Sequence, residues 1–111
     1  MALLVKPAEH AWVERSGFVD NATAVAVRPG EEGKSHFISM IRASYSSPST
    51  SGTLTLKVGG VPIAETTIHG DGAIQWVPAL KITEGTEVSV ELAPSGTAGV
   101  TGSVILSGYT F

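Results

Sequence analysis

The chain has 111 residues, of which 15% are charged, carries a formal net charge of −3 and contains no cysteine. This length suits one domain, and the lack of cysteine excludes a disulfide framework, a thiolate zinc site and a cysteine nucleophile. The acidic balance argues against a nucleic-acid partner, because phosphate binding needs clustered Lys and Arg. Soluble domains average about 25% charged residues. Either Ser, Thr and Gly keep this surface soluble, or part of it is covered.

The first 21 residues differ from the rest, because they show no clean alternation of apolar and polar side chains. The apolar run at residues 2–5 is too short for a signal peptide or a spanning helix. We therefore expect synthesis in the cytoplasm without an export or membrane signal. We interpret residues 1–21 as a partly extended arm that packs on its own domain or on a neighbouring copy. Its larger apolar residues are Leu3, Leu4, Val5, Trp12 and Phe18.

Residues 22–111 show the alternation and regularly spaced turn residues that are typical of antiparallel strands. Gly59 and Gly60 predict a two-residue hairpin, since both positions tolerate positive φ, and Pro78 is expected to end a strand. The pattern predicts an all-β fold, an antiparallel β-sandwich or jelly roll of seven or eight strands with an N-terminal arm. The strands are expected at residues 22–28, 35–46, 53–58, 61–69, 73–77, 87–92 and 100–111.

Strand alternation also predicts the core. In the long strand at residues 35–46 the alternation is imperfect, with Phe37 and Ile41 on one face and Ile38 and Met40 on the other. A bulge, or burial on both faces, would explain this. The residues expected in the core are Val25, Val27, Leu54, Leu56, Ile63, Trp76, Val88, Val90, Val104 and Leu106.

Few residue patterns indicate chemistry. His69 and Asp71 flank Gly70 and offer two metal ligands, but zinc sites need more, so we expect a solvated turn, no metal and no cofactor. No serine lies in a Gly-x-Ser-x-Gly nucleophile elbow. Nothing favours a pair of carboxylates across a cleft, as a glycosidase would need. We therefore expect that the chain is not an enzyme.

The aromatic residues raise a second possibility. Trp12, Trp76, Tyr45 and Tyr109 could form a platform on which sugar rings stack, as in β-sandwich carbohydrate-binding modules. Trp76 alternates with Ile74, however, and is expected in the core. The aromatic content of 6% is low for a lectin.

The last predicted strand is apolar on both faces, with Val104 and Leu106 on one and Ile105, Tyr109 and Phe111 on the other. A sandwich strand with one face in water should alternate, so both of its faces are expected to be covered. The arm could cover the second face, or that face could form a subunit interface, and an exchanged arm would do both. We expect Ile105, Tyr109 and Phe111 at a subunit interface.

Four segments together resemble small virion proteins of tailed bacteriophages: SHFISMIRASY (35–45), GTLTLKVGG (52–60), GTEVSVELA (85–93) and GTAGVTGSVILSGY (96–109). The resemblance covers residues 22–111 and implies a β-sandwich or jelly roll, often trimeric, that decorates or cements the capsid or sits on fibres. It carries no catalytic residues.

The resemblance implies a decoration or cement protein on the capsid exterior, which binds the major capsid protein as a homotrimer and needs no cofactor, nucleic acid or membrane. Arms of such proteins commonly reach the capsid, so Leu3, Leu4, Val5, Trp12 and Phe18 are expected to contact it. The alternative is a receptor- or carbohydrate-binding module of a tail fibre or spike.

Overall fold

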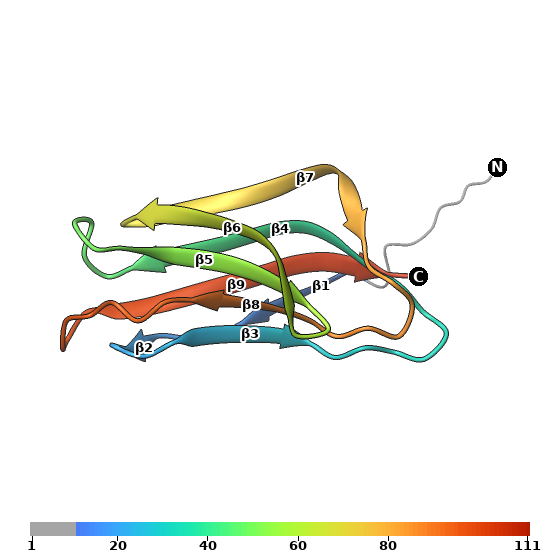
Figure 1. The fold of residues 1–111 in the computed structure, drawn as a ribbon, viewed down its shortest axis with the longest axis horizontal. Helices are drawn as coiled ribbons and strands as arrows, with labels where there is room; N and C mark the ends of the chain where they lie inside the picture. The colour runs from blue at the N-terminus through green and yellow to red at the C-terminus, as the bar shows by residue number, and fades with distance from the viewer. Residues whose placement is uncertain (1–10) are drawn as a thin grey trace.

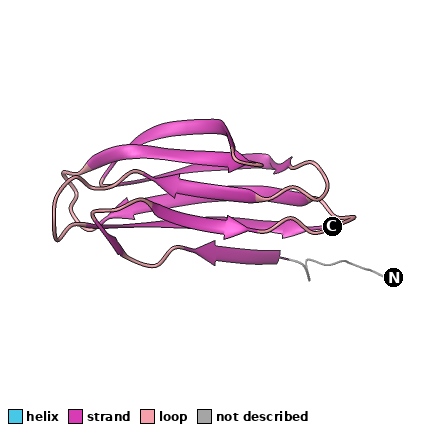
Figure 2. Ribbon diagram, turned by 60° about the horizontal axis from the view of Figure 1, so that its bottom comes forward, coloured by secondary structure: helices cyan, strands magenta, loops and turns pink. Residues whose placement is uncertain are grey.

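The computed structural model describes residues 11–111, and this part of the chain contains strands and loops only (Figure 2). It therefore contains no helix that is long and apolar enough to cross a membrane. The nine strands of this part are β1 (Ala11–Arg15), β2 (Val19–Asp20), β3 (Ala24–Arg28), β4 (His36–Tyr45), β5 (Ser51–Val58), β6 (Val61–His69), β7 (Asp71–Lys81), β8 (Val88–Leu92) and β9 (Thr101–Thr110).

The strands form two antiparallel layers (Figure 1). The first sheet has the order β1-β9-β4-β7, with the short β2 also paired to β9, and the second has the order β3-β8-β5-β6. Residues His69 and Asp71 pair where the chain passes from β6 to β7, and this single pair joins the layers at one corner. With β2 set aside, the strand order is that of a jelly roll. The predicted all-β sandwich is therefore confirmed.

The core lies between the two sheets. Of the residues expected there, six are fully buried: Leu54, Leu56, Val88, Val90, Val104 and Leu106. Trp76 is only partly buried, but it packs against this core.

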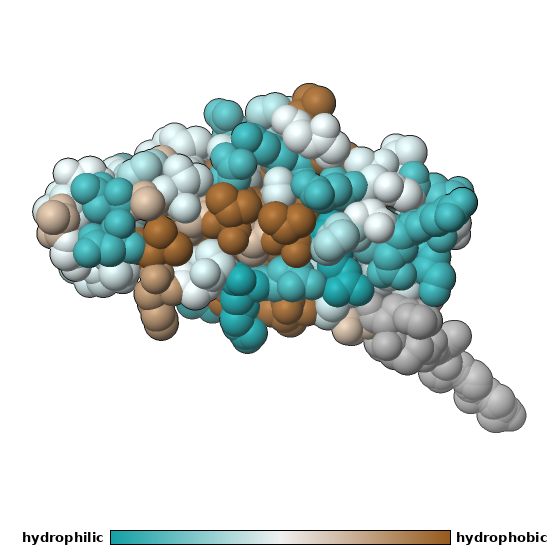
Figure 3. Space-filling view, turned by 90° about the horizontal axis from the view of Figure 1, so that it is seen from below, coloured by the Kyte–Doolittle hydropathy of each residue, from teal (hydrophilic) through white to brown (hydrophobic). Residues whose placement is uncertain are grey.

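The expectation was wrong for Val25, Val27 and Ile63, which are 40, 37 and 49% exposed. Strand β3 turns the small Ala24 and Ala26 inward, so its valines lie on the outer face. The view from below, onto the edge of the sandwich at which β3 lies in Figure 1, shows apolar side chains among polar ones (Figure 3).

Ile63 lies on the exposed side of β6 with Glu65 and Thr67, next to an irregularity in the pairing of β6 with β5. Leu56 pairs with Ala64, whereas the next residue, Lys57, pairs with Pro62. Ile63 therefore has no opposite residue on β5, whereas Ala64, Thr66 and Ile68 form the more buried side of β6.

Strand β4 contains a bulge, which was one of the two explanations for the imperfect alternation of its apolar residues. The register of β4 shifts between Ile38 and Met40 against both β7 and β9. Ser39 is the extra residue, and Ile38 and Ile41 are therefore both buried. The expectation that Phe37 and Ile41 share a face of β4 was wrong. After the bulge at Ser39, the odd-numbered Ile41 lies on the buried face with Ile38, while Phe37 lies on the other face.

The strand containing Pro78 continues to Lys81, beyond its predicted end. Residues 76–79 lie between the pairs Gln75–Met40 and Leu80–Ile38, and only Ser39 of β4 stands opposite them. A proline is tolerated here because it lies in an irregular stretch of an edge strand. The predicted hairpin at Gly59 and Gly60 is present, with φ of 59° and 83°.

Residues 11–20 of the expected arm belong to the sandwich. Strand β1 pairs with β9 from Ala11 opposite Tyr109 to Arg15 opposite Ile105, and β2 pairs with the beginning of β9. This part of the arm therefore packs on its own domain, and residues 21–23 connect β2 to β3. Leu3, Leu4 and Val5 lie outside the described residues.

Candidate functional site

Most of the described residues that the sequence predicted as contact or interface residues lie on the outward side of the first sheet. Along β9 the buried residues alternate with half-buried ones, so Ser103, Ile105, Ser107 and Tyr109 point away from the core. Strand β9 lies between β1 and β4, and its outward residues therefore occupy the middle of the face. We call this surface the outer face of the first sheet.

An aromatic cluster occupies one end of the outer face. The rings of Phe37 and Tyr109 stack almost in parallel, with centroids 5.1 Å apart and an interplanar angle of 5°. Phe111 meets both rings edge to face, at 5.8 Å from Phe37 and 5.4 Å from Tyr109. Phe111 remains 59% exposed. Two of the expected interface residues are thus brought together, and Phe37 joins them because β4 pairs it opposite Tyr109.

Ile105, the third expected interface residue, lies near the middle of β9 and beside Phe18. Both line an open, largely apolar hollow of about 260 Å³ between the β1–β2 connection and β9. Phe18 itself is 82% exposed. A residue expected in the arm and one expected at the interface therefore border the same hollow, which is completed by Arg15, Gly17, Ser103 and Val104.

Cations flank the apolar residues of this face. Ile105 has Arg15 opposite it on β1 and Arg42 opposite it on β4. At the aromatic end, Lys81 of β7 stands opposite Phe37. The outer face therefore combines aliphatic, aromatic and positively charged side chains.

Trp12 belongs to a different environment, at the edge where the two sheets meet. Its Nε1 donates a hydrogen bond of 2.8 Å to Thr110 Oγ1. The guanidinium carbon of Arg28 lies 4.9 Å from the centre of the indole ring, which meets the His36 ring edge to face at 5.6 Å. Trp12 thus ties β1 to strands of both sheets.

The hydrogen bonds of His36 assign its tautomer. Its Nε2 lies 2.7 Å from the carbonyl oxygen of Pro29, which can only accept, so Nε2 carries the hydrogen. Its Nδ1 then accepts from the Thr110 hydroxyl, 2.7 Å away. A continuous chain of donors runs from Trp12 through Thr110 and His36 to Pro29. This polar network is fully paired and its residues serve the fold.

Arg28 completes this edge. It forms ion pairs of 2.9 Å with Glu14 and 3.3 Å with Glu31. Glu14 lies on β1 and Arg28 on β3, so the pair spans the two sheets. The third nitrogen of its guanidinium group, Nε, is buried without a hydrogen-bond partner among the described residues.

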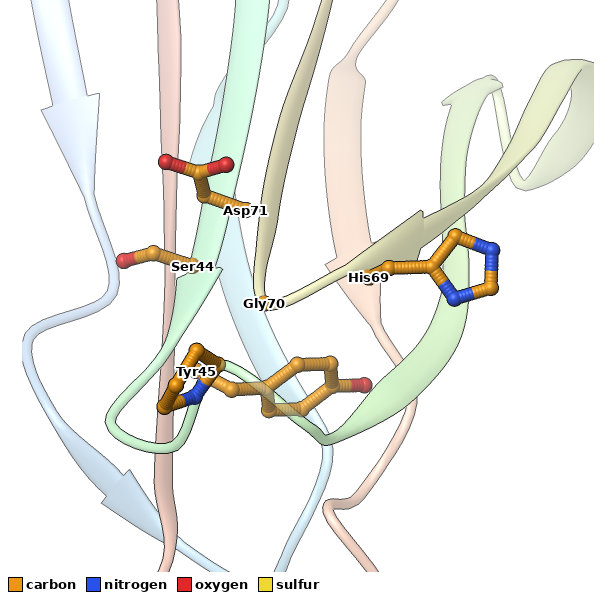
Figure 4. Close-up of a pocket in the computed structure, with 6 residues that line it drawn as sticks. Ser44, Tyr45, His69, Gly70 and Asp71 are labelled. Atoms are coloured by element: carbon orange, nitrogen blue, oxygen red, sulfur yellow. The ribbon is translucent and has the colours of Figure 1, made fainter.

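His69 and Asp71 do not converge on one point. They border a shallow hollow of about 240 Å³, and Figure 4 shows their side chains pointing away from each other on either side of Gly70. His69 Nδ1 instead lies 2.7 Å from Ser51 Oγ. Among residues 11–111, no group of three or more His, Asp or Glu side chains is arranged to hold a metal ion.

The four aromatic residues considered for sugar stacking are not brought together. Tyr45 is buried, and its hydroxyl donates to the Ala93 carbonyl at 2.7 Å. Burial raises the pKa of Tyr45 above its usual value. Trp12 lies in the edge network and Trp76 packs against the core. Only Tyr109 reaches the outer face, where its partners are Phe37 and Phe111 rather than the other three.

Comparisons with known proteins give structural likeness without sequence likeness. No protein-family model matches the chain, and no curated protein matches it. The CBM36-1 domain of a multidomain xylanase from the hindgut metagenome of Trinervitermes trinervoides is 10% identical, with a TM-score of 0.46 over 90% of this chain and 94% of that one.

A carbohydrate-binding module CBM36, solved with calcium and xylotriose, is 14% identical, with a TM-score of 0.45 over 85% of this chain and 76% of that one. The insecticidal delta-endotoxin Cry8Ea1 from Bacillus thuringiensis is 9% identical, with a TM-score of 0.46 over 80% of this chain. The match covers only 18% of the endotoxin. At these identities no residue role is transferred to this chain.

Proposed function

We propose that this protein is a non-enzymatic structural protein of a tailed-phage virion, a capsid decoration or cement protein that binds the capsid as an oligomer. One observation carries the proposal. Two groups of apolar residues on the outer face, Phe18 with Ile105 and Tyr109 with Phe111, are incompletely covered by the folded domain. Exposed apolar surface of this kind marks interaction sites.

The physical basis of binding is burial of this surface. Strand β9 carries no charged residue, so its outer side can be covered without the cost of desolvating a charge. Burial contributes about 25 cal/mol for each Å² of apolar area, less the cost of ordering the partners. The outer face would serve either the contact between subunits or the contact with the capsid.

The oligomer is tested by substitution on this face. Ile105→Asp should dissociate the oligomer, because it places a charge at the hollow shared with Phe18, and light scattering on a sizing column should report a lower mass. Val25→Asp is the control, since Val25 is an aliphatic residue on the outer face of the second sheet. A wild-type protein that is monomeric at all accessible concentrations would contradict the oligomer.

The capsid contact is tested with a truncation. Removing residues 1–10 takes away Leu3, Leu4 and Val5 but none of the described strands. We expect the truncated protein to lose binding to phage heads that lack the protein, measured by co-sedimentation. Undiminished binding would contradict the role of these three residues.

A second candidate is a receptor- or carbohydrate-binding module of a fibre or spike. The nearly parallel rings of Phe37 and Tyr109, together with the exposed Phe111, favour it because sugar rings stack on such surfaces. A glycan array would separate the two functions. Specific binding that is lost in Tyr109→Ala but kept in Phe18→Ala would favour this second function, and a blank array would favour decoration.

A further inference from the structure

We infer that the outer face of the first sheet binds an acidic protein surface, with Arg15 and Arg42 engaging carboxylates on either side of Ile105. The inference rests on the proposed docking function and names the chemistry of the partner. It follows from how the strand register distributes charge over the two outer faces of the sandwich.

Arg15 and Arg42 belong to one row across three strands. Ile105 of β9 stands opposite Arg15 on β1 and opposite Arg42 on β4. Neighbouring strands lie about 4.8 Å apart, so the two arginine backbones are about 10 Å apart with Ile105 between them. Both arginines are exposed. This row offers two guanidinium groups on either side of an apolar contact.

The aromatic cluster forms a second row on the same face. Tyr109 follows Ile105 by four residues on β9, which places the two rows about 13 Å apart. In this row Lys81 stands opposite Phe37, and Phe37 stands opposite Tyr109. Each row therefore contains both apolar side chains and cations. A partner that covers the face must contact both rows at once.

The charges of this face are not neutralised internally. Arg15, Arg42 and Lys81 form no ion pair within residues 11–111, whereas Arg28 is paired with carboxylates at the edge of the sandwich. The described strands place two carboxylates on this face: Asp71, opposite Ser44 on β4, and Asp20, opposite Thr101 on β9. Asp20 accepts a hydrogen bond of 2.9 Å from the Gly99 N–H.

The outer face of the second sheet has the reverse balance. There Lys57 is paired with Glu91 at 3.0 Å, and Glu65 adds a second carboxylate. The protein as a whole is acidic, with a net charge of −3. Against that background, three cations and two carboxylates leave the outer face of the first sheet with a surplus of positive charge. This surplus favours an acidic partner and fixes the orientation of docking.

Protein carboxylates fit the row at Ile105 better than other anions. A guanidinium group binds a carboxylate through two parallel hydrogen bonds. A partner must also place an apolar group against Ile105 and the neighbouring Phe18, between the carboxylates that bind the two arginines. A protein surface offers both kinds of group. A nucleic acid would require a denser basic patch than these cations provide.

The inference is tested with the full chain and poly-L-glutamate, titrated at low salt and followed by amide chemical shifts. We expect shifts to concentrate on β1, β9 and β4, and Arg42→Gln to weaken binding by about tenfold. Arg42→Lys, which keeps the charge but loses the planar fork, should recover part of the affinity. Lys57→Gln, which removes the same charge from the second sheet, should have little effect.

Equal binding by Arg42→Gln and Lys57→Gln, or no binding at all, would overturn the inference. A parallel titration with hyaluronate tests an acidic glycan: tighter binding that depends on the same arginines would also overturn the assignment to a protein. Co-sedimentation with phage heads separates the inference from the proposed function. Head binding that survives in an Arg15→Gln, Arg42→Gln double variant refutes the inference alone, whereas wild-type protein that never binds heads refutes the function.

Discussion

Trp12 and Thr110 lie 98 residues apart in the chain, yet the indole Nε1 donates a 2.8 Å hydrogen bond to the threonine hydroxyl. The same hydroxyl lies 2.7 Å from Nδ1 of the buried His36. One oxygen atom therefore links the first, fourth and ninth strands at the edge of the sandwich. The contact makes residues near the beginning of the described chain part of the fold rather than an appendage to it.

The first prediction concerns this oxygen. Thr110→Val keeps the shape of the side chain but leaves the Trp12 N–H and the His36 ring nitrogen without their partner. Each unpaired buried group costs about 1–3 kcal/mol, so the free energy of unfolding in urea should fall by about 2–4 kcal/mol. The edge-to-face contact between the rings of Trp12 and His36 should be retained in this variant, which separates loss of hydrogen bonds from loss of packing. Thr101→Val, a more exposed position on the same strand, is the control, and an equal loss there would contradict the role of the network.

The second prediction compares two truncations. Removing residues 1–10 should leave the sandwich folded, because the described strands begin at Ala11. Removing residues 1–20 deletes β1 and β2, which exposes one edge of β9 and removes Trp12 and Glu14 from Arg28. We expect the longer truncation to unfold or aggregate at room temperature. Circular dichroism during heating would show this, and two identical melting curves would contradict the assignment of residues 11–20 to the sheet.

The third prediction distinguishes the observed core from the expected one. Leu106→Ala removes a fully buried side chain and should lower the free energy of unfolding by about 2–5 kcal/mol. Ile63→Ala alters a half-exposed residue that has no opposite residue on β5, and it should cost less than about 1 kcal/mol. Urea denaturation of both variants gives the comparison. A larger loss for Ile63→Ala would mean that β6 faces the core with the opposite side.

The fourth prediction concerns alkaline pH. Burial raises the pKa of Tyr45 above its usual value of 10.0, so the unfolded chain releases this proton at a lower pH than the folded protein. The contribution of Tyr45 is therefore fully present below pH 10 and is lost as the pH rises through the higher folded-state pKa. Tyr45→Phe also removes the hydrogen bond to Ala93, at a cost of about 1 kcal/mol near neutral pH.

The measurement is urea denaturation of wild type and Tyr45→Phe at neutral pH and at a pH above 10. The stability difference between the two proteins should shrink at the higher pH, because only the wild type has this proton to lose. A difference that stays constant would contradict the assignment of a raised pKa to Tyr45.

Much of the fold could be predicted because apolar and polar residues alternate along most of the strands. Leu54 and Leu56 alternate with threonine and lysine, and Val88 and Val90 with serine and glutamate, and all four are buried. The periodicity fails where the backbone is irregular. At Ser39 an extra residue reverses the faces of β4, and alternation alone cannot place such a shift at one position.

Strand β3 shows a different limit. Its alternation of alanine and valine is perfect, but hydrophobicity alone favours burying the larger Val25 and Val27. In the structure Ala24 and Ala26 are buried instead, and the two valines are exposed. Which face of such a strand turns inward depends on the volume left by residues far away in the sequence.

The candidate site could be predicted in part. The absence of charge in β9 indicated that Ile105, Tyr109 and Phe111 needed a cover. Phe37 and the two flanking arginines were not foreseen, because their positions depend on pairing between strands that are more than 60 residues apart. Trp12 was expected among the contact residues, and only the three-dimensional structure shows that it is engaged by Thr110 and Arg28.

The position of β9 also bears on how the protein is made. This strand is the last of the described strands to leave the ribosome, yet it lies between β1 and β4 in the finished sheet. Until it emerges, β1 has no neighbour within the first sheet, and the buried side of β4 lacks Val104 and Leu106. Such long-range pairing makes folding slow. Nascent chains therefore carry open strand edges for most of their synthesis, and the yield of soluble protein should depend on how quickly translation reaches β9.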